Sequence, residues 1–176
     1  MPARVIDGKA AAAAWRADVA AAIKADRAAR LHAPQPALRV LLVGDHPASQ
    51  AYVSTKARVG GEIGVDAAVE RLPEDTDTAA LLARIAALNA DPSIHGILVQ
   101  LPLPDAVDAD AVLDAIDPAK DVDGFHPLNA GKLHSGAPLA DLLAPCTPLG
   151  CLRLLEAEYG AGGLRGLNAV VVGRSN

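Results

Sequence analysis

Two spacings of apolar residues alternate along this chain, one helical and one extended. Helical spacing predicts helices at residues 9–31, from Pro47 onward, and from Thr76 or Asp77 to Asn89. Short β-branched or continuously apolar runs between these helices predict strands at 38–43, 65–72 and 94–101. Strands alternating with helices at these spacings imply βαβ units with right-handed crossovers. The predicted fold class is therefore α/β, with a parallel sheet between helices.

The last sixty residues continue this pattern. A short helix is predicted at 108–116, and another begins at Pro145–Gly150, where Thr147 is a good N-cap and Pro148 suits the first helical position. A final apolar run predicts a strand at 168–172 that ends in a glycine turn. Such a turn after a buried parallel strand normally leads into a helix whose N-terminus binds phosphate. Here the turn is present and the helix is not.

Composition and charge narrow the function classes. The chain has 176 residues, of which 51% are hydrophobic and 21% charged, so one or two compact domains are expected. The formal net charge is −5, with Lys and Arg scattered, which argues against nucleic acid and anionic membrane surfaces as partners. No stretch has the length of a signal peptide core or a membrane span, so a cytoplasmic protein is expected.

Trp15 and the two cysteines are predicted to be structural. Trp15 lies on the apolar face of the first helix and is assigned to the core. Cys146 and Cys151 are five residues apart and lack a set of Cys or His partners, which fits neither a disulfide framework nor a zinc site. They are interpreted as reduced core thiols.

Three polar residues of the helix that begins near Pro47 share one face. A rotation of about 100° per residue places Ser49, Tyr52 and Lys56 within roughly a 60° arc. A hydroxyl, an aromatic ring and an ammonium together suit a flat polar ligand with a proton donor or acceptor beside it. A solvated helix face with a structural tyrosine is the alternative.

Ligands of parallel sheets bind beyond the carboxyl ends of the strands, and Gln100 lies at such an end. The segment Leu101-Pro102-Leu103-Pro104 behind it is stiffened by two prolines and could hold Gln100 still. The alternative for Gln100 is an ordinary polar end of a strand.

The stretch 117–133 is predicted to be a loop dense in charged and turn-forming residues, which is typical of functional loops. Asp117, Asp121 and Asp123 offer oxygen ligands, but their order is not that of a calcium loop, so no metal is expected. His126 is either a general acid or base or, as its position beside a proline favours, a structural hydrogen-bonder.

Taken together, these stretches resemble the bifunctional methylenetetrahydrofolate dehydrogenase/methenyltetrahydrofolate cyclohydrolase family. The matching text follows the family's order: Ile6-Asp-Gly-Lys9, Val43-Gly-Asp, Pro47-Ala-Ser-Gln-Ala-Tyr-Val-Ser-Thr-Lys56, Gly96-Ile-Leu-Val-Gln-Leu-Pro-Leu-Pro104, Pro118-Ala-Lys-Asp-Val-Asp-Gly-Phe-His-Pro-Leu-Asn-Ala-Gly131, Pro145-Cys-Thr-Pro148 and Val172-Gly-Arg-Ser175. These motifs cover almost the whole chain.

The resemblance implies a folate-binding catalytic domain at 1–145, then a connecting helix and the first strand of a truncated Rossmann-type NADP domain at 146–176. It implies that Tyr52 stacks on the folate rings, that Lys56 is catalytic, and that Gln100 supports Lys56. It further implies that Asp123 binds the pterin, that Ser49 supports Lys56, and that Leu101 and Pro102 contact the substrate. Gly173, Arg174 and Ser175 would face the phosphates of NADP.

The implied activity is NADP-dependent oxidation of 5,10-methylenetetrahydrofolate, followed by hydrolysis to 10-formyltetrahydrofolate. This chemistry belongs to one-carbon metabolism and supplies purine biosynthesis. The resemblance also implies a homodimer at full length. Because the family's sequence continues well beyond Ser175, little NADP-dependent oxidation is expected of residues 1–176 alone.

Two other interpretations remain. The spacing of Tyr52 and Lys56 is that of the catalytic pair in short-chain dehydrogenases, but there the pair follows the glycine-rich turn, whereas here it precedes the one candidate turn by over a hundred residues. The second alternative is a non-catalytic remnant that binds folate or serves as an interaction domain.

Overall fold

A computed structural model describes residues 5–30, 33–160 and 162–173. At its centre is a three-stranded sheet in the order β2-β1-β3, and both strand pairs are parallel. The strands are β1 (Ala37–Val43), β2 (Asp66–Leu72) and β3 (Gly96–Val99). The parallel α/β sheet predicted from the sequence is confirmed. Strand β3 is shorter than the predicted 94–101, because its pairing with β1 runs from Gly96 to Val99 only.

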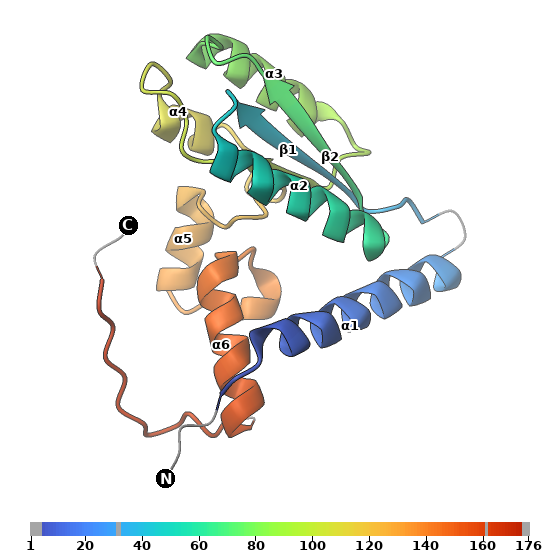
Figure 1. The fold of residues 1–176 in the computed structure, drawn as a ribbon, viewed down its shortest axis with the longest axis vertical. Coiled ribbons are helices and arrows are strands. Elements are labelled where there is room, and N and C mark those ends of the chain that lie inside the picture. Colours follow the sequence, from blue (N-terminus) through green and yellow to red (C-terminus); the bar gives the residue numbers. More distant parts are fainter. Residues whose placement is uncertain (1–4, 31–32, 161, 174–176) are drawn as a thin grey trace.

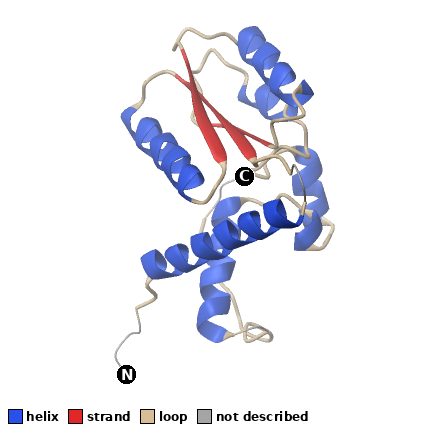
Figure 2. Cartoon of the chain, turned by 90° about the vertical axis from the view of Figure 1, so that its right-hand side faces the viewer, coloured by secondary structure: helices blue, strands red, loops and turns tan. Residues whose placement is uncertain are grey.

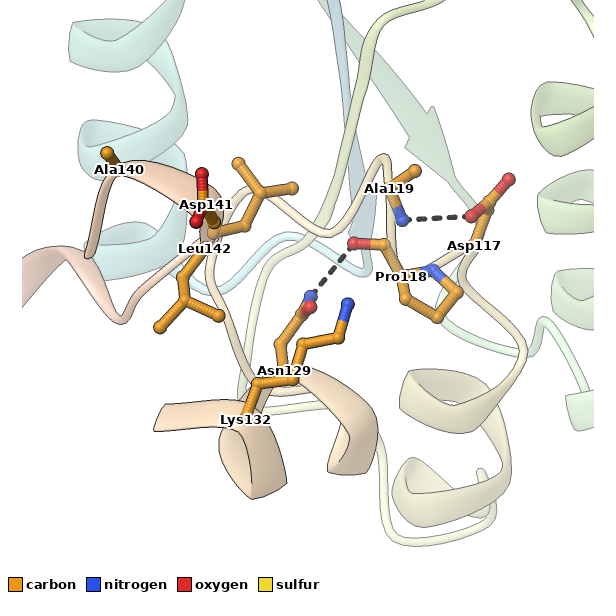
Figure 3. Close-up of a pocket in the computed structure, with 9 residues that line it drawn as sticks. Asp117, Pro118, Ala119, Asn129, Lys132, Ala140, Asp141 and Leu142 are labelled. Carbon is orange, nitrogen blue, oxygen red and sulfur yellow. Dashed lines mark hydrogen bonds between the residues drawn. The ribbon is translucent and has the colours of Figure 1, made fainter. Parts of the chain in front are cut away.

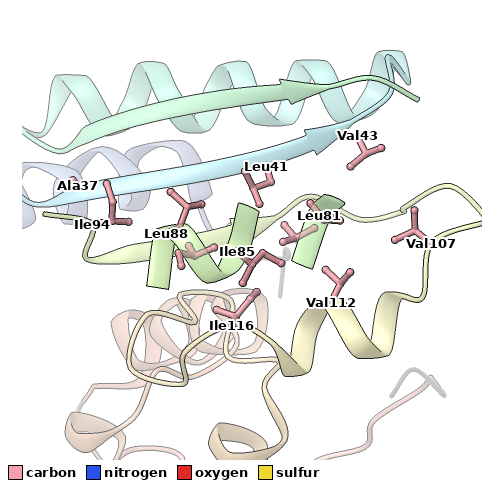
Figure 4. Packing of buried hydrophobic residues seen from close by; sticks show 12 residues of the cluster. Ala37, Leu41, Val43, Leu81, Ile85, Leu88, Ile94, Val107, Val112 and Ile116 are labelled. Atoms are coloured by element: carbon pink, nitrogen blue, oxygen red, sulfur yellow. The ribbon is translucent and has the colours of Figure 1, made fainter. Parts of the chain in front are cut away.

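Helices cover both faces of this sheet, so the expected three layers are present (Figures 1 and 2). Helix α2 (Pro47–Glu62) packs Val53 against Val40, Leu42 and Leu98 on one face. The other face carries α3 (Thr78–Ala90) and α4 (Ala109–Asp114). Figure 4 shows the larger core cluster on that side.

Local chemistry explains where the elements of the sheet region begin and end. Gly44 adopts a φ of 76°, which suits glycine, and so allows the tight turn from β1 towards α2. Asp77 caps α3 by accepting a hydrogen bond from the backbone N–H of Ala80 at 2.7 Å, one of the two caps predicted. At the other end of α3, the Lys120 ammonium donates to the carbonyls of Leu88, Asn89 and Asp91.

The remaining helices are α1 (Gly8–Ala29), α5 (Pro127–His134) and α6 (Cys146–Tyr159), with a 3₁₀ turn at Leu139–Asp141. Figure 1 shows them below the sheet, outside its two helical layers. Helix α1 contains no buried residue, so the assignment of Trp15 to the core is wrong. Trp15 is only half-buried, because this helix does not pack against the sheet.

Four further predictions are corrected. Residues 127–134 of the predicted loop form α5, with Pro127 at its first position. Helix α6 begins at Cys146 after Pro145, so Thr147 is not its N-cap. Both cysteines are free and exposed rather than buried in the core. The predicted strand 168–172 is an irregular segment in which Val170, Val171 and Val172 are about 90% exposed, because it has no neighbouring strand to pair with among the described residues.

No helix in the described ranges combines the length and the apolar character that crossing a membrane requires.

Candidate active site

Helix α2 carries two stripes of side chains, and only one of them faces a cavity. Ser49 and Val53, four residues apart, are both buried against the sheet region. Tyr52 and Lys56 form the neighbouring stripe, and both line a cavity. Ser49 is 4% exposed and does not line that cavity. The predicted pairing of Tyr52 with Lys56 is therefore present, whereas Ser49 lies beneath it.

Gln100 reaches this cavity from the sheet. Its backbone N–H donates to the carbonyl of Leu41 at 2.9 Å, which extends the hydrogen bonding of β3 by one residue. Its side-chain N–H donates to the carbonyl of Leu101 at 2.7 Å, and this bond turns the amide oxygen towards α2. That oxygen accepts a hydrogen bond from the ammonium of Lys56 at 3.3 Å. Residues 44 positions apart in sequence thus meet, and Gln100 orients the lysine.

Asp123 lies in the turn 121–126, which runs beside β3 in space. Asp121 pairs with Ile97 in an isolated parallel bridge, and the backbone N–H of Ile97 donates to the carbonyl of Lys120 at 2.8 Å. These contacts anchor the start of the turn beside the sheet. Asp123 follows two residues later and lines the same cavity as Lys56 and Gln100.

Gly124 lets the chain after Asp123 pack against the segment before α6. Its φ is 70°, a left-handed conformation that side chains disfavour. A Cβ atom at this position would lie 2.6 Å from the carbonyl oxygen of Leu143 and 2.7 Å from the nitrogen of Pro145. Glycine is required here for both reasons, and its close packing brings the start of α6 to the cavity.

The cavity has a volume of about 640 Å³, and its walls come from α2, β1, β3 with the two residues after it, the turn 121–126 and the start of α6. Its lining residues are Leu38, Tyr52, Lys56, Leu98, Gln100, Leu101, Val122, Asp123, Phe125, Cys146 and Thr147. Tyr52 is 66% and Phe125 48% exposed, so two of the chain's four aromatic residues leave ring surface free here. Apolar walls with a few polar groups are typical of sites for small organic ligands.

The charges around the cavity influence one another. Burial raises the pKa of the Asp123 carboxyl; the Lys56 ammonium opposes this rise and the Asp121 carboxylate adds to it. Cys146 is exposed as a residue, but its Sγ lies at the cavity wall, and this partial burial raises the pKa of the thiol, with a further contribution from the charge of Asp123. No ion pair joins Lys56 to Asp123 in the part of the chain that the structure describes. Both charged groups therefore remain available to a ligand.

Several lining residues were not predicted from the sequence. Cys146 was interpreted as a core thiol, but its Sγ donates to the carbonyl of Val122 at 3.4 Å at the cavity wall. Phe125 was not singled out, although a phenylalanine inside a polar, turn-rich stretch was an available signal. The role of Val122 depends on the turn geometry, which no local pattern reports.

Other predicted residues lie elsewhere. Leu101 lines the cavity, whereas Pro102 lines a neighbouring hollow beside Gly44 and His46. Gly173 belongs to the exposed irregular segment and does not line the cavity. Arg174 and Ser175 lie outside the described residues.

His126, Asp117 and Asp121 have structural partners. The Nδ1 atom of His126 accepts a hydrogen bond from the backbone N–H of Leu128 at 3.1 Å and caps α5, in agreement with the structural interpretation. Across the described residues, no group of three or more His, Cys, Asp or Glu side chains is arranged to hold a metal ion.

A second hollow lies between α5 and the segment that contains the 3₁₀ turn (Figure 3). Asp117, Asp141 and Lys132 line it together with Asn129, whose side-chain N–H donates to the carbonyl of Pro118 at 2.9 Å. Its volume is about 470 Å³, and no aromatic ring lines it. It is therefore a weaker candidate for a flat ligand than the cavity beside Lys56.

Comparison with known proteins identifies the family. The sequence profile described as "Tetrahydrofolate dehydrogenase/cyclohydrolase, catalytic domain" matches residues 6–123, more than half of the chain. The bifunctional protein FolD of Rhodospirillum centenum is 58% identical over 174 residues, which are 99% of this chain and 55% of that protein. That of Rhodopseudomonas palustris (strain BisA53) is 53% identical over 176 residues, 100% of this chain and 57% of that protein.

Solved structures agree with the sequence comparison. The bifunctional enzyme FolD, methylenetetrahydrofolate dehydrogenase/cyclohydrolase, from Campylobacter jejuni has a TM-score of 0.83 at 43% identity, covering 88% of this chain and 53% of that one. The Trypanosoma brucei methylenetetrahydrofolate dehydrogenase-cyclohydrolase, solved with NADP cofactor and an inhibitor, has a TM-score of 0.83 at 33% identity, covering 90% and 53%. The chain spans about half the length of the curated relatives it matches. By sequence and by structure, it belongs to the tetrahydrofolate dehydrogenase/cyclohydrolase family.

Proposed function

We propose that this chain supplies the folate site of a methylenetetrahydrofolate dehydrogenase/cyclohydrolase. The overall reaction would be oxidation of 5,10-methylenetetrahydrofolate with NADP, then hydrolysis of the methenyl product to 10-formyltetrahydrofolate. The observation that carries the proposal is the meeting of Tyr52, Lys56, Gln100 and Asp123 at one cavity from three separate parts of the chain. Family membership supports it.

We assign each of these side chains a role. The exposed ring of Tyr52 would stack on the flat pterin or aminobenzoyl ring. Asp123 would accept hydrogen bonds from the amino and ring N–H groups of the pterin, which are donors that suit a carboxylate. Lys56 would move the proton, with Gln100 holding its ammonium at 3.3 Å. Leu101 would add apolar contact, while Ser49 and Pro102, which do not line the cavity, would act at a distance.

The hydrolytic step suits these residue types. The methenyl compound is a delocalised cation, and water must attack its one-carbon centre and lose a proton. Lys56 lies at the cavity wall beside an oriented amide, so it is positioned to exchange that proton. Leu98 and Val122 line the same cavity and would limit the access of other water molecules.

Little of the predicted site for NADP falls among the described residues. Of the three positions predicted to face its phosphates, Gly173 alone is described, and it lies in an irregular segment without a neighbouring strand. NADP would accept the hydride in the oxidation step. We therefore propose that residues 1–145 form the folate-binding catalytic domain and that 146–176 begin the NADP-binding domain. We also propose a homodimer at full length, a cytoplasmic location and a contribution to purine biosynthesis.

Calorimetric titration of the chain with a stable folate analogue, and separately with NADP, tests the proposal. We expect the folate analogue to bind and NADP to give no measurable heat. We also expect Lys56→Ala, introduced into the longest natural polypeptide that contains this sequence, to abolish most methenyl hydrolysis. Unchanged hydrolysis in that variant would overturn the assignment of Lys56.

The same experiments distinguish the proposed enzyme from the two forms of the non-catalytic alternative. A non-catalytic folate-binding remnant would bind the folate analogue, yet no natural polypeptide containing this sequence would hydrolyse the methenyl compound. A chain that serves only as an interaction domain would bind neither ligand.

A further inference from the structure

The carboxylate of Asp121, close to the cavity, is buried and makes three hydrogen bonds. Asp121 is 2% exposed. Its Oδ1 accepts a hydrogen bond from the backbone N–H of Gly124 at 3.1 Å. Its Oδ2 accepts from the backbone N–H of His126 and from the side-chain N–H of Asn129, both at 2.9 Å. A buried carboxylate with three N–H donors strongly constrains the groups that donate to it.

These three donors belong to parts of the chain that would otherwise be free to move apart. Gly124 lies in the middle of the turn, His126 is the residue that caps α5, and Asn129 lies inside α5. Asp121 itself is fixed to the sheet through its bridge with Ile97. One side chain therefore ties the edge of the sheet, the turn and the following helix together.

The turn held in this way carries the ligand-facing groups. Val122, Asp123 and Phe125 all line the cavity, and Gly124 between them packs against the segment before α6. Asp121 does not line the cavity. Its effect on a ligand must therefore pass through the residues that it holds.

Asp121 also acts on Asp123 through its charge. The groups that influence the pKa of Asp123 are the burial of its own carboxyl, which raises it, the Lys56 ammonium on α2, which lowers it, and the Asp121 carboxylate, which raises it. Cys146 on α6 is another titratable group at this wall, beside Tyr52 on α2, and the Asp121 charge raises the pKa of the Cys146 thiol too. Asp121 thus influences Asp123 in two ways, by holding the turn that carries it and by its negative charge.

We propose that Asp121 is a positioning residue for the folate site: its buried carboxylate fixes the 121–126 turn so that Asp123 and Phe125 face the ligand. The inference rests on the proposed function for the identity of the ligand. Asp121→Asn tests it with little change of volume. The new amide keeps one acceptor oxygen and turns its N–H group either against Gly124 or against His126 and Asn129, so at least one of the three donors loses its acceptor.

The first measurement needs no ligand. Carboxyl-carbon NMR titration of the free chain should show the pKa of Asp123 falling in Asp121→Asn, since the neighbouring negative charge is removed. Asp117→Asn is the matched control, because Asp117 lies in the same stretch but is not among the groups that influence Asp123. An unchanged Asp123 titration in a folded Asp121→Asn chain would overturn the proposal.

The second measurement is calorimetric titration with the folate analogue. We expect the Kd to rise at least about tenfold in Asp121→Asn, equivalent to about 1.4 kcal/mol, and to remain unchanged in Asp117→Asn. If Asp121→Asn does not fold, Asn129→Ala removes one donor and leaves the charge in place, with an expected rise of about threefold to tenfold. An unchanged Kd in whichever variant folds would contradict the positioning role.

The two measurements separate failure of this inference from failure of the proposed function. If the wild-type chain binds no folate analogue while Asp121→Asn shifts the titration of Asp123, the proposed function fails and the control of Asp123 by Asp121 stands. If folate binds and neither the titration nor the Kd responds to Asp121, this inference alone is wrong.

Discussion

The sheet region, residues 37–122, and the C-terminal region, residues 127–173, use apolar residues in opposite ways. Every buried hydrophobic residue of the described chain lies between Ala37 and Ile116. From 127 to 173 the one buried residue described is Asn129, while large apolar side chains are exposed there: Leu128, Leu133, Leu139, Leu155, Tyr159, Leu167, Val170, Val171 and Val172.

The difference shows where the free energy of folding comes from. The sheet region closes a core within itself, so it carries most of the stability expected from burial of apolar surface. The C-terminal region contacts the sheet region through Cys146 with the carbonyl of Val122 and Asn129 with Asp121, and it packs on Gly124 of the connecting turn through the segment 143–145. The cavity lies at this junction, and residues of α2 and α6 both line it.

The largest expected effect tests the core. Leu41 of β1 is fully buried in the core cluster that includes residues of α3 and α4. Leu41→Ala should therefore lower the free energy of unfolding by about 3–5 kcal/mol. Leu155 is 41% exposed, and Leu155→Ala should cost less than about 1 kcal/mol. Urea denaturation followed by circular dichroism measures both. Equal costs would show that the two regions share one core.

The next effect tests the junction. Gly124→Ala would force a left-handed residue to accept a Cβ and press it against backbone atoms of 143–145, so a loss of about 2–4 kcal/mol is expected. Gly131, inside α5, has nothing within 4 Å of its Cβ position, and Gly131→Ala should stabilise by up to about 1 kcal/mol. Thermal unfolding of both variants gives the comparison. An unchanged unfolding temperature in Gly124→Ala would mean that the turn and the segment 143–145 are not tightly packed.

A smaller effect tests the charge of Asp123. Because the pKa of its carboxyl is raised in the folded state, the group's contribution to stability is complete below its ordinary pKa of 3.8 and is lost as the pH rises through the folded value. Asp123→Asn removes the cost of burying the ionised carboxyl, so the variant should unfold at a slightly higher temperature than wild type at neutral pH. The difference should shrink on acidification towards pH 3.8. A destabilised variant at neutral pH would contradict the assigned burial.

The smallest effect tests the exposed segment. A chain ending at Gly160 removes Val170, Val171 and Val172, which make no buried contact in the described structure. Its free energy of unfolding should match that of wild type within about 0.5 kcal/mol. Slow hydrogen exchange at residues 168–172 of the wild-type chain, or a clear loss of stability in the short chain, would show that this segment packs somewhere.

Sequence patterns predicted the sheet region well, because its strands and helices follow from local periodicity and are then locked by a shared core. The stripe of Tyr52 with Lys56, the strand end at Gln100 and the cap at Asp77 were predictable for the same reason. Predictions that assumed burial failed outside this region. Trp15, Cys146 and the segment 168–172 were predicted to lie in a core, but none of them is fully buried within the described chain.

The turn at 121–126 shows a different limit. Its richness in charged and turn-forming residues indicated function, but the sequence could not tell that Asp121 is buried and holds the turn while Asp123 faces the cavity. That division depends on the bridge to Ile97 and on the capping of α5, which are contacts between residues distant in sequence. The family resemblance had singled out Asp123, but the contacts of Asp121 became visible only in the structure.

Mapping the binding of a folate analogue by amide NMR on the isotope-labelled chain tests the central claim most directly. The account predicts that the largest shift changes fall at 52–56, 98–101 and 122–125, around the cavity beside Lys56. Changes confined to 117–119 and 139–143, around the hollow of Figure 3, or no changes at all at millimolar ligand, would contradict it.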